Sequence, residues 1–349
     1  MFSEGGQETT VVDIHCHMTP AGAILAGQRG EEWHGVQMQQ NESGNLTWEI
    51  GGHRMKLTWE NPSLGWESRL TKMDEIGVDV QVMSLSPEMY WYGHLGRERA
   101  LGFAQEANDS IAEAMAEHPT RFQGLAHLPL QDAQASVKEL ERCVKELGMA
   151  GVAVPGNVVG TDWDSPELYP IIEAAAGLDV VFFIHPASDV RFPPEDRYWF
   201  RNIIGIPLEE TISLAALIFS GVFDKHPNLK VCMAHGGGFA CFGLGRFDHA
   251  HKVRPECQHL PNRPSDYASN VYFDSLTHSY PKLRYLLDEI GGSKVVLGTD
   301  YPADMGQTEP VEWIRGADNL TTEERHAVLG RNVEALLGDR TKAFAQGAP

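Results

Sequence analysis

The chain has 349 residues, 42% of them hydrophobic and 22% charged, a composition typical of a soluble globular enzyme. Its formal net charge of −20 argues against nucleic acid and anionic membranes as partners. No apolar run approaches the ~20 residues of a membrane span, and no secretory signal is recognised. The five cysteines have no CxxC spacing and predict reduced thiols, so we expect a cytoplasmic protein.

The first predicted strand carries two histidines at its end. Residues 1–10 are polar and acidic, and we expect them, like residues 347–349, to be frayed. An apolar segment then begins at Val11 and reaches His15 and His17, and Pro20 closes it. Side chains two apart on a strand point to the same face, so both imidazoles are aimed at one pocket. When such a pair stands alone, chance or a structural role is the more frequent explanation.

An insertion at about residues 21–65 follows this strand. Residues 46–50 and 54–59 alternate in polarity around Gly51 and Gly52, which predicts a small β-hairpin. Insertions after barrel strands lie over the active-site face, so we expect a lid that carries Arg54 and Lys56. A surface insert without a role in the site is the alternative.

Strands and helices alternate over the rest of the chain. Further strands are predicted at residues 78–84, 122–128, 151–154, 180–184, 231–234, 271–275 and 295–299. Helices are predicted at residues 99–117, 133–147, 166–176, 208–219, 281–289 and 322–337. Most of the strands are apolar on both faces, as parallel strands covered by helices are. The pattern predicts a (β/α)8 TIM barrel in which residues 1–349 form one domain. A doubly wound open sheet is the alternative, weakened because no Gly-x-Gly-x-x-Gly follows the first strand.

Three later strands also end in side chains that bind metals or transfer protons. His185, His235 and Asp300 each follow an apolar run and precede Gly or Pro, directly or within two residues. The carboxyl ends of barrel strands meet at one face, so these residues are expected beside His15 and His17. Imidazoles with one carboxylate suit zinc, and also manganese or iron. Residues 151–154 offer no lysine that could bridge two ions, so we predict one divalent metal, Zn²⁺ first and Mn²⁺ second.

These residues resemble the pattern of the amidohydrolase superfamily. The similarity extends along nearly the whole chain, through residues 77–82, 129–132, 219–221, 235–238, 244–246, 264–267 and 297–302. More narrowly, the chain is similar to the branch of metal-dependent decarboxylases typified by 2-amino-3-carboxymuconate-6-semialdehyde decarboxylase. That branch also contains hydratases and hydrolases.

The resemblance implies a role for each candidate residue. It implies that His15, His17, His185 and Asp300 hold the metal, with water completing the shell. It implies that His235 is the general acid–base. The residues it places at the substrate are Arg54, Trp199, Arg246 and Arg254, with Arg246 reaching into a neighbour's site across a dimer. Residues 89–92 depart from the pattern, which leaves the shape of the substrate open.

Two of these arginines can also be interpreted from spacing. Arg246 and Arg254 are eight residues apart, and residues 244–253 are predicted to be helical; eight residues are a little over two turns, so the two arginines are expected to share roughly one face. Two guanidinium groups on one face suit a carboxylate, although pairing with Asp248 or other acids is the alternative. Three further polar residues near strand ends are interpreted as satisfied core groups or supporting partners: His127, Asp274 and His278.

The leading hypothesis is a single-metal, non-oxidative decarboxylase of an unsaturated or aromatic carboxylic acid. The expected partners are that small anionic acid and a second copy of the chain, in a homodimer or a larger homo-oligomer. A hydrolase or hydratase using the same residues is the alternative, and a non-enzymatic metal-binding barrel is the third.

Overall fold

A closed barrel of eight parallel strands forms the centre of the molecule. The computed structural model describes residues 1–42, 45–56, 65–187, 190–192, 197–342 and 344. The strands pair in chain order: β3 (Val12–Met18), β8 (Val80–Leu85), β9 (Phe122–Ala126), β10 (Gly151–Val154), β11 (Val181–Ile184), β12 (Lys230–Met233), β13 (Tyr272–Asp274) and β14 (Val295–Val296). Closure comes from Ile14 N donating to Leu297 O at 3.0 Å and His17 N donating to Tyr301 O at 2.7 Å. The predicted (β/α)8 barrel is therefore confirmed.

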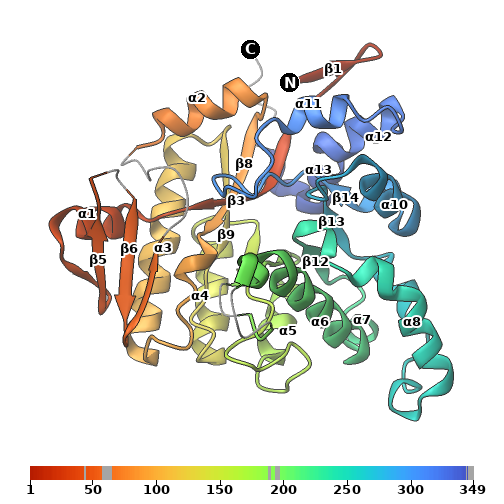
Figure 1. Cartoon of the computed structure of the whole chain (residues 1–349), viewed down its shortest axis with the longest axis horizontal. Helices are drawn as coiled ribbons and strands as arrows, with labels where there is room; N and C mark the ends of the chain where they lie inside the picture. The colour runs from red at the N-terminus through yellow and green to blue at the C-terminus, as the bar shows by residue number, and fades with distance from the viewer. Residues whose placement is uncertain (43–44, 57–64, 188–189, 193–196, 343, 345–349) are drawn as a thin grey trace.

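Helices alternate with the strands and surround the barrel (Figure 1). The longer ones are α2 (Glu67–Ile76), α3 (Arg97–Glu117), α4 (Ala133–Lys145), α5 (Tyr169–Gly177), α6 (Ile206–Phe219), α8 (Ala240–Val253) and α10 (Tyr280–Ile290). The shorter ones are α7 (Val222–Lys225), α9 (Pro264–Ala268), α11 (Pro310–Arg315), α12 (Thr322–His326) and α13 (Asn332–Leu337). A capping box between Thr321 and Glu324 starts α12, which confirms the capped helix start that was predicted near Thr322.

The barrel interior is filled by apolar side chains from the strands. Val12, Val80, Val181 and Phe183 belong to one buried cluster with Leu336 of α13. The opposite faces of the strands pack under the surrounding helices in a second, larger cluster. Burial on both faces explains why these strands have continuous apolar sequences.

The insertion after β3 is larger than a hairpin. It contains α1 (Ala21–Arg29) and an antiparallel sheet of β4 (Glu32–Trp33), β5 (Val36–Gln40), β6 (Leu46–Ile50) and β7 (His53–Lys56). β6 and β7 form the predicted hairpin as far as residue 56; residues 57–59 lie outside the described part of the chain. The sheet lies beside α3, at the left of Figure 1. Trp33 packs on Phe103, and Trp48 packs on Trp91, each with ring centroids 5.1 Å apart.

The start of the chain is ordered, so the prediction of a frayed N-terminus is wrong. β1 (Phe2–Glu4) and β2 (Gln7–Thr9) form a hairpin. Phe2 is buried with its ring 4.9 Å from that of His326, and the Met1 amino group lies 2.8 Å from an Asp79 carboxylate oxygen. The buried ring and the terminal ion pair hold a hairpin whose strands are too short to show a periodicity.

One helical stretch is longer and more apolar than the sequence analysis expected. The helical residues from Arg197 to Phe219 number 23 and contain an 18-residue window with a mean hydropathy of 1.5, enough to cross a membrane by length and composition alone. The stretch includes α6, whose buried side contains Glu209 and Glu210. Glu209 pairs with Arg191 and Glu210 with His235, so this side of the helix is accounted for by packing on the barrel.

Candidate metal centre and active site

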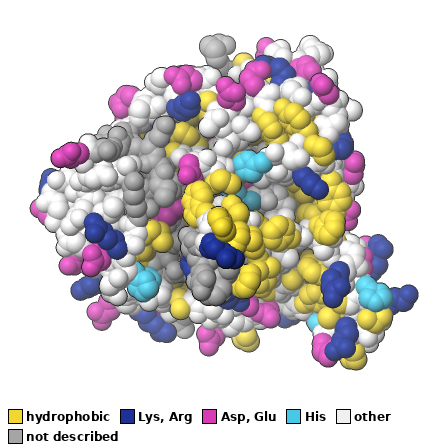
Figure 2. Space-filling model, viewed as in Figure 1, with side chains coloured by type: hydrophobic (Ala, Val, Ile, Leu, Met, Phe, Trp, Pro, Cys, Tyr) yellow, Lys and Arg dark blue, Asp and Glu magenta, His cyan; other side chains and the backbone are white. Residues whose placement is uncertain are grey.

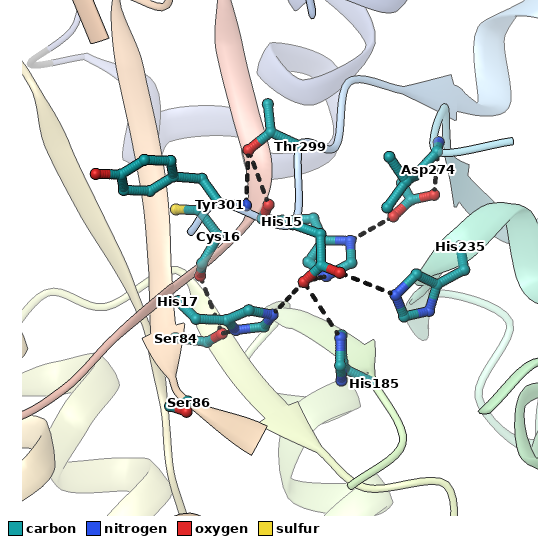
Figure 3. Close-up of polar contacts among 12 residues, drawn as sticks. His15, Cys16, His17, Ser84, Ser86, His185, His235, Asp274, Thr299 and Tyr301 are labelled. Carbon is teal, nitrogen blue, oxygen red and sulfur yellow. Dashed lines mark hydrogen bonds and ion pairs between the residues drawn. The ribbon is translucent and has the colours of Figure 1, made fainter. Parts of the chain in front are cut away.

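Four of the predicted metal ligands converge at the carboxyl end of the barrel. His15 and His17 come from β3, His185 directly follows β11, and Asp300 follows β14. All four are buried, and one ligand atom from each lies within 4.8 Å of the others. Asp300 Oδ1 lies 3.2 Å from His15 Nε2, 3.0 Å from His17 Nε2 and 3.8 Å from His185 Nε2. Figure 3 shows the three imidazoles turned toward this point.

The other ring nitrogen of each histidine is held by its own acceptor. His15 Nδ1 lies 2.6 Å from Asp274 Oδ2, and His185 Nδ1 lies 2.8 Å from the Pro186 carbonyl. His17 Nδ1 lies 2.9 Å from Ser84 Oγ, whose hydroxyl donates to the Cys16 carbonyl and therefore accepts from the imidazole. With a proton on each Nδ1, every Nε2 is left with its lone pair directed inward.

This arrangement fits a divalent metal. Three nitrogen lone pairs and a carboxylate oxygen face one another, and none of these atoms is a donor when the imidazoles are neutral. His15 Nε2 and His185 Nε2 are buried and have no hydrogen-bond partner among the described residues. Buried polar atoms are rarely left unpaired, and outer partners that orient imidazoles are typical of metal ligands. A divalent ion held by these three nitrogens and the carboxylate oxygen would satisfy all four atoms.

The titration behaviour of the cluster also favours a cation. Burial lowers the pKa of His17 to about 4 and that of His185 well below its ordinary value. Burial acts the same way on His15, but the carboxylates of Asp300 and Asp274 outweigh it and raise the pKa of His15 to about 9. Although burial opposes ionisation of Asp300, the imidazoles hold its pKa well below the usual range. Two carboxylates thus attract positive charge to one small space.

Buried hydrogen bonds to Asp13 position the two strand ends that carry His15 and Asp300. Asp13 accepts from the backbone N–H groups of His15 and Thr299, at 3.1 and 3.0 Å, and from the Thr299 hydroxyl at 2.6 Å. Asp300 N donates to the His15 carbonyl at 2.7 Å. Asp300 and His235 both have positive φ, 58° and 46°, which L-residues adopt at a cost of order 1–3 kcal/mol. The fold holds both side chains in the site at that cost.

His235 lies beside the cluster and outside the ligand set. It follows β12, and its Nε2 is 3.5 Å from Asp300 Oδ2. Its Nδ1 lies 2.6 Å from Glu210 Oε1 on α6, and its side chain is 16% exposed. Burial lowers the pKa of His235, but the adjacent Glu210 and Asp300 carboxylates raise it well above the ordinary value. The geometry suits a proton donor or acceptor next to a metal.

The predictions for the three polar residues near strand ends, interpreted as core groups or as partners of the site residues, are confirmed only in part. Asp274 is a supporting partner as expected, because it accepts from His15 and from Gly236 N at 2.8 Å. His127 is a core residue as expected, with Tyr92 Oη 3.2 Å from its Nδ1. His278 is exposed at the edge of a cavity, so its prediction as a core or supporting group is wrong.

Glu210 was not predicted to take part in the site. The only signal was the pair of acids at residues 209–210 at the start of an apolar helix. An acid in such a position indicates a buried partner, but the sequence alone does not say which one.

A cavity of about 460 Å³ opens beside the cluster. His235 and Asp300 contribute to its wall, together with residues of α6, α8 and α10 and of the loop after β13. Most of the wall is apolar: Ile203, Ile206, Pro207, Phe239, Phe242, Leu276, Leu286 and Met305. In Figure 2, hydrophobic side chains surround a hollow near the centre of this face, in which histidine is visible. The volume is within the range of small-molecule sites.

None of the four predicted substrate residues is among the residues that line the cavity. Arg54 is exposed on β7, and Trp199 is 39% exposed just before α6. Arg246 is exposed on α8. Arg254 follows the end of α8, where its side chain is 63% exposed and pairs with Glu256 at 3.0 Å. The helix does not continue to Arg254, whose backbone is extended. The prediction that Arg246 and Arg254 share one helical face is therefore wrong.

Comparison with known proteins agrees with this geometry. The amidohydrolase family model matches residues 12–338. A 2-amino-3-carboxymuconate-6-semialdehyde decarboxylase of Dictyostelium discoideum is 35% identical over 331 residues, covering 94% of this chain and 91% of that protein. A gamma-resorcylate decarboxylase of Polaromonas sp. is 31% identical over 251 residues, covering 68% of this chain and 76% of that protein.

Solved structures share the fold. A dihydroxybenzoic acid decarboxylase from Polaromonas sp., solved with bound manganese and the inhibitor 2-nitroresorcinol, superposes with a TM-score of 0.72 and 24% identity. The match covers 95% of this chain and 97% of that one. The family model spans the whole barrel, and the similarity to the Dictyostelium protein extends over nearly the whole chain. This chain belongs to the amidohydrolase family.

Proposed function

We propose that this protein is a metal-dependent, non-oxidative decarboxylase of an unsaturated or aromatic carboxylic acid. The observation that carries the proposal is the buried set of three imidazoles and one carboxylate, with His235 beside it at the wall of a largely apolar cavity. The relatives named above support this choice of reaction. An apolar wall suits a flat unsaturated or aromatic ring, and the cluster suits a metal that binds its polar groups.

The metal would be held by His15, His17, His185 and Asp300. When bound, it would supply Lewis acidity to an oxygen of the substrate. We propose zinc because three imidazoles and one carboxylate are ligands that zinc prefers. Manganese is the alternative, since it also accepts this ligand set.

His235 would supply the proton. Loss of CO₂ leaves the electrons of the broken carbon–carbon bond on the substrate carbon, which must take up one proton. His235 faces both the cavity and Asp300, and the hydrogen bond to Glu210 fixes the orientation of its ring. The apolar walls around it exclude water, which favours protonation of carbon over attack by hydroxide.

We propose further that the working unit is a homodimer in which Arg246 reaches the second copy's cavity. Arg246 is exposed on α8, one turn after Phe242, whose side chain is 87% exposed. A large exposed aromatic beside an exposed arginine is typical of a protein interface. Arg246 would then bring a positive charge to a carboxylate substrate.

The reaction is tested by incubating the metal-loaded protein in D₂O with a panel of aromatic and unsaturated carboxylic acids. We expect release of CO₂ and a product with one deuterium at the carbon that carried the carboxylate. Product that contains oxygen from labelled water, without CO₂, would instead identify a hydrolase or hydratase. Turnover that survives removal of the metal would contradict the metal-dependent mechanism.

A further inference from the structure

A buried arginine lies behind the metal-binding end of β3. Arg69 on α2 is 8% exposed, and among the described residues it forms no ion pair with a carboxylate. Removing a cation from water is costly unless hydrogen bonds compensate for the lost hydration. An apolar side chain would serve packing at such a position at least as well. The buried charge therefore indicates a role other than packing.

The guanidinium group of Arg69 contacts three parts of the barrel. Its Nη2 donates to the His17 carbonyl, and its Nη1 donates to Gln81 Oε1 of β8 at 2.8 Å. Its Cζ lies 4.8 Å from the centroid of the Tyr301 ring, which Figure 3 shows directed away from the imidazoles. Because Tyr301 directly follows Asp300, one side chain contacts the backbone of one predicted ligand and the residue next to another.

Gln81 extends these contacts to the strand that carries His15. Gln81 is fully buried, and its Nε2 donates to Asp13 Oδ2 at 3.2 Å. The register between β3 and β8 shifts between Asp13 and Cys16, so regular backbone pairing is interrupted there. Irregularities of this kind redirect side chains beside active sites. At this one, the side chains of Arg69, Gln81 and Asp13 connect the two strands.

We propose that Arg69 is a positioning residue for the metal centre, which fixes the backbone of His17 relative to that of Asp300. The inference rests on the metal site of the proposed function, and Arg69 would touch neither the ion nor the substrate. The planar fork of a guanidinium can donate in two directions while its face contacts an aromatic ring. Without it, the segments that carry the two ligands would lose a shared anchor, and their ligand atoms would fit one ion less well.

The test measures metal binding without substrate. The metal-free protein is titrated with Co²⁺, whose absorption spectrum depends on the arrangement of its ligands, in the wild type and in R69M, R69K and R121M. Arg121 is the matched control because it also joins α2 to the barrel, at the amino end of β8. Its guanidinium donates to Asp74 Oδ1 and to the Asp79 carbonyl, each at 2.7 Å.

The variants should separate positioning from general stability, which is followed by the melting temperature. We expect R69M to bind Co²⁺ about tenfold more weakly than the wild type and with shifted absorption bands. R69K should recover part of the affinity, because an ammonium group keeps the charge but not the fork. R121M should lower the melting temperature and keep the affinity and the spectrum of the wild type.

An R69M protein that is less stable but keeps the wild-type affinity and spectrum would overturn the proposal. So would an R121M protein that changes both as much as R69M does. If R69M does not fold, R69K decides, and wild-type affinity and spectrum in R69K would overturn the proposal. A wild type that does not bind Co²⁺ would overturn the proposed metal site, and this inference with it. Because no turnover is measured, the other outcomes leave the decarboxylase assignment standing.

Discussion

At the scale of single residues, the site depends on the side-chain and backbone groups that fix the histidine tautomers. Asp274 holds the proton of His15 on Nδ1, Ser84 does the same for His17, and the Pro186 carbonyl does so for His185. The metal-facing nitrogens are basic only in these tautomers. The outer partners therefore determine metal affinity although none of them would touch the ion.

Substitution of Asp274 by asparagine tests this dependence. In D274N, an amide group would replace the carboxylate beside His15 Nδ1, so the imidazole would lose a charged acceptor and its preferred tautomer. We expect metal affinity to fall by about 10–100-fold while the fold is kept, because the remaining amide oxygen can still accept from Gly236 N. Competition with a metal chelator measures the affinity. D288N, on the outer face of α10, is the control, and equal affinities in the two variants would argue against a supporting role for Asp274.

A second set of variants should distinguish the metal ligands from the proposed proton donor. H15A and D300A remove a ligand, so both should lose the metal and the activity. H235N should keep the metal and lose about 10²–10⁴ in turnover, which is typical of losing a general acid–base group. Elemental analysis of each purified variant gives the metal content. If H235N also loses its metal, His235 is a ligand and not the proton donor.

The sequence predicts the site residues at strand ends and misses those on helices, for a physical reason. His15, His17, His185, His235 and Asp300 stand at the ends of apolar strands, and barrel topology brings such ends together. Glu210 comes from a helix, and its place beside His235 depends on how α6 packs against the barrel. A single sequence carries no local pattern for that packing, so this residue was not predicted.

At the scale of the elements, the barrel strands were predictable because burial on both faces leaves continuous apolar segments. The β1–β2 hairpin was missed because each strand has three residues, and tertiary contacts of Phe2 hold it. β4 and β5 were missed for a similar reason: β4 has two residues and β5 mixes polar and apolar side chains. In both cases, contacts with residues far away in the sequence stabilise the strands.

Helices α3 and α4 are joined by a buried polar network around Glu139. Asn108 Nδ2 donates to Glu139 Oε1 at 2.7 Å, and Arg142 Nη2 donates to the same oxygen at 2.8 Å. Asn108 also binds the backbone of His127 at the end of β9, through its amide nitrogen and its oxygen. The network therefore connects two helices to the barrel.

Because of this network, the stability of the fold should depend on pH in the acidic range. Burial raises the pKa of Glu139, but the hydrogen bonds from Arg142 and Asn108 outweigh it and lower the pKa below its ordinary value of 4.5. A carboxyl group with a lowered folded pKa stabilises the fold fully above the unfolded value. That stabilisation is lost as the pH falls through the folded value.

E139Q should therefore be less stable than the wild type by about 1–3 kcal/mol at pH 7, with a smaller difference below pH 4.5. Urea denaturation across this pH range measures the difference. E141Q is the matched control, because Glu141 lies on the same helix with its side chain 45% exposed and paired with Lys145. A difference between E139Q and the wild type that does not change with pH would contradict the ionised network.

At the scale of the whole molecule, the strongly acidic chain must attract an anionic substrate. Among the described residues the cavity of one chain offers Lys282 as its one lysine or arginine, while Arg246 lies on the exposed side of α8. Three apolar side chains near the cavity mouth are also substantially exposed: Phe242, Phe239 and Ile203. A second copy packed on this face would bury them and add a positive charge to each site.

Complementation between two inactive variants tests that arrangement. In R246A the metal cluster is intact but the proposed arginine for the partner's site is missing. In D300A the cluster is lost but Arg246 is present. Each variant alone should be inactive or nearly so. After subunit exchange, each mixed dimer would contain one site with both an intact cluster and a partner arginine. Equal mixing should therefore restore about a quarter of the wild-type activity, since half of the dimers are mixed and each has one working site.

Exchange itself must be shown independently, for example by native mass spectrometry of chains with different isotope labels. Full exchange without recovered activity would place Arg246 in its own chain's site or outside the mechanism. Activity in a mixture without exchange would mean that one of the two variants retains activity of its own. Recovery that follows the fraction of mixed dimers would establish that the catalytic unit is larger than one barrel, because then neither chain holds all the groups that its reaction needs.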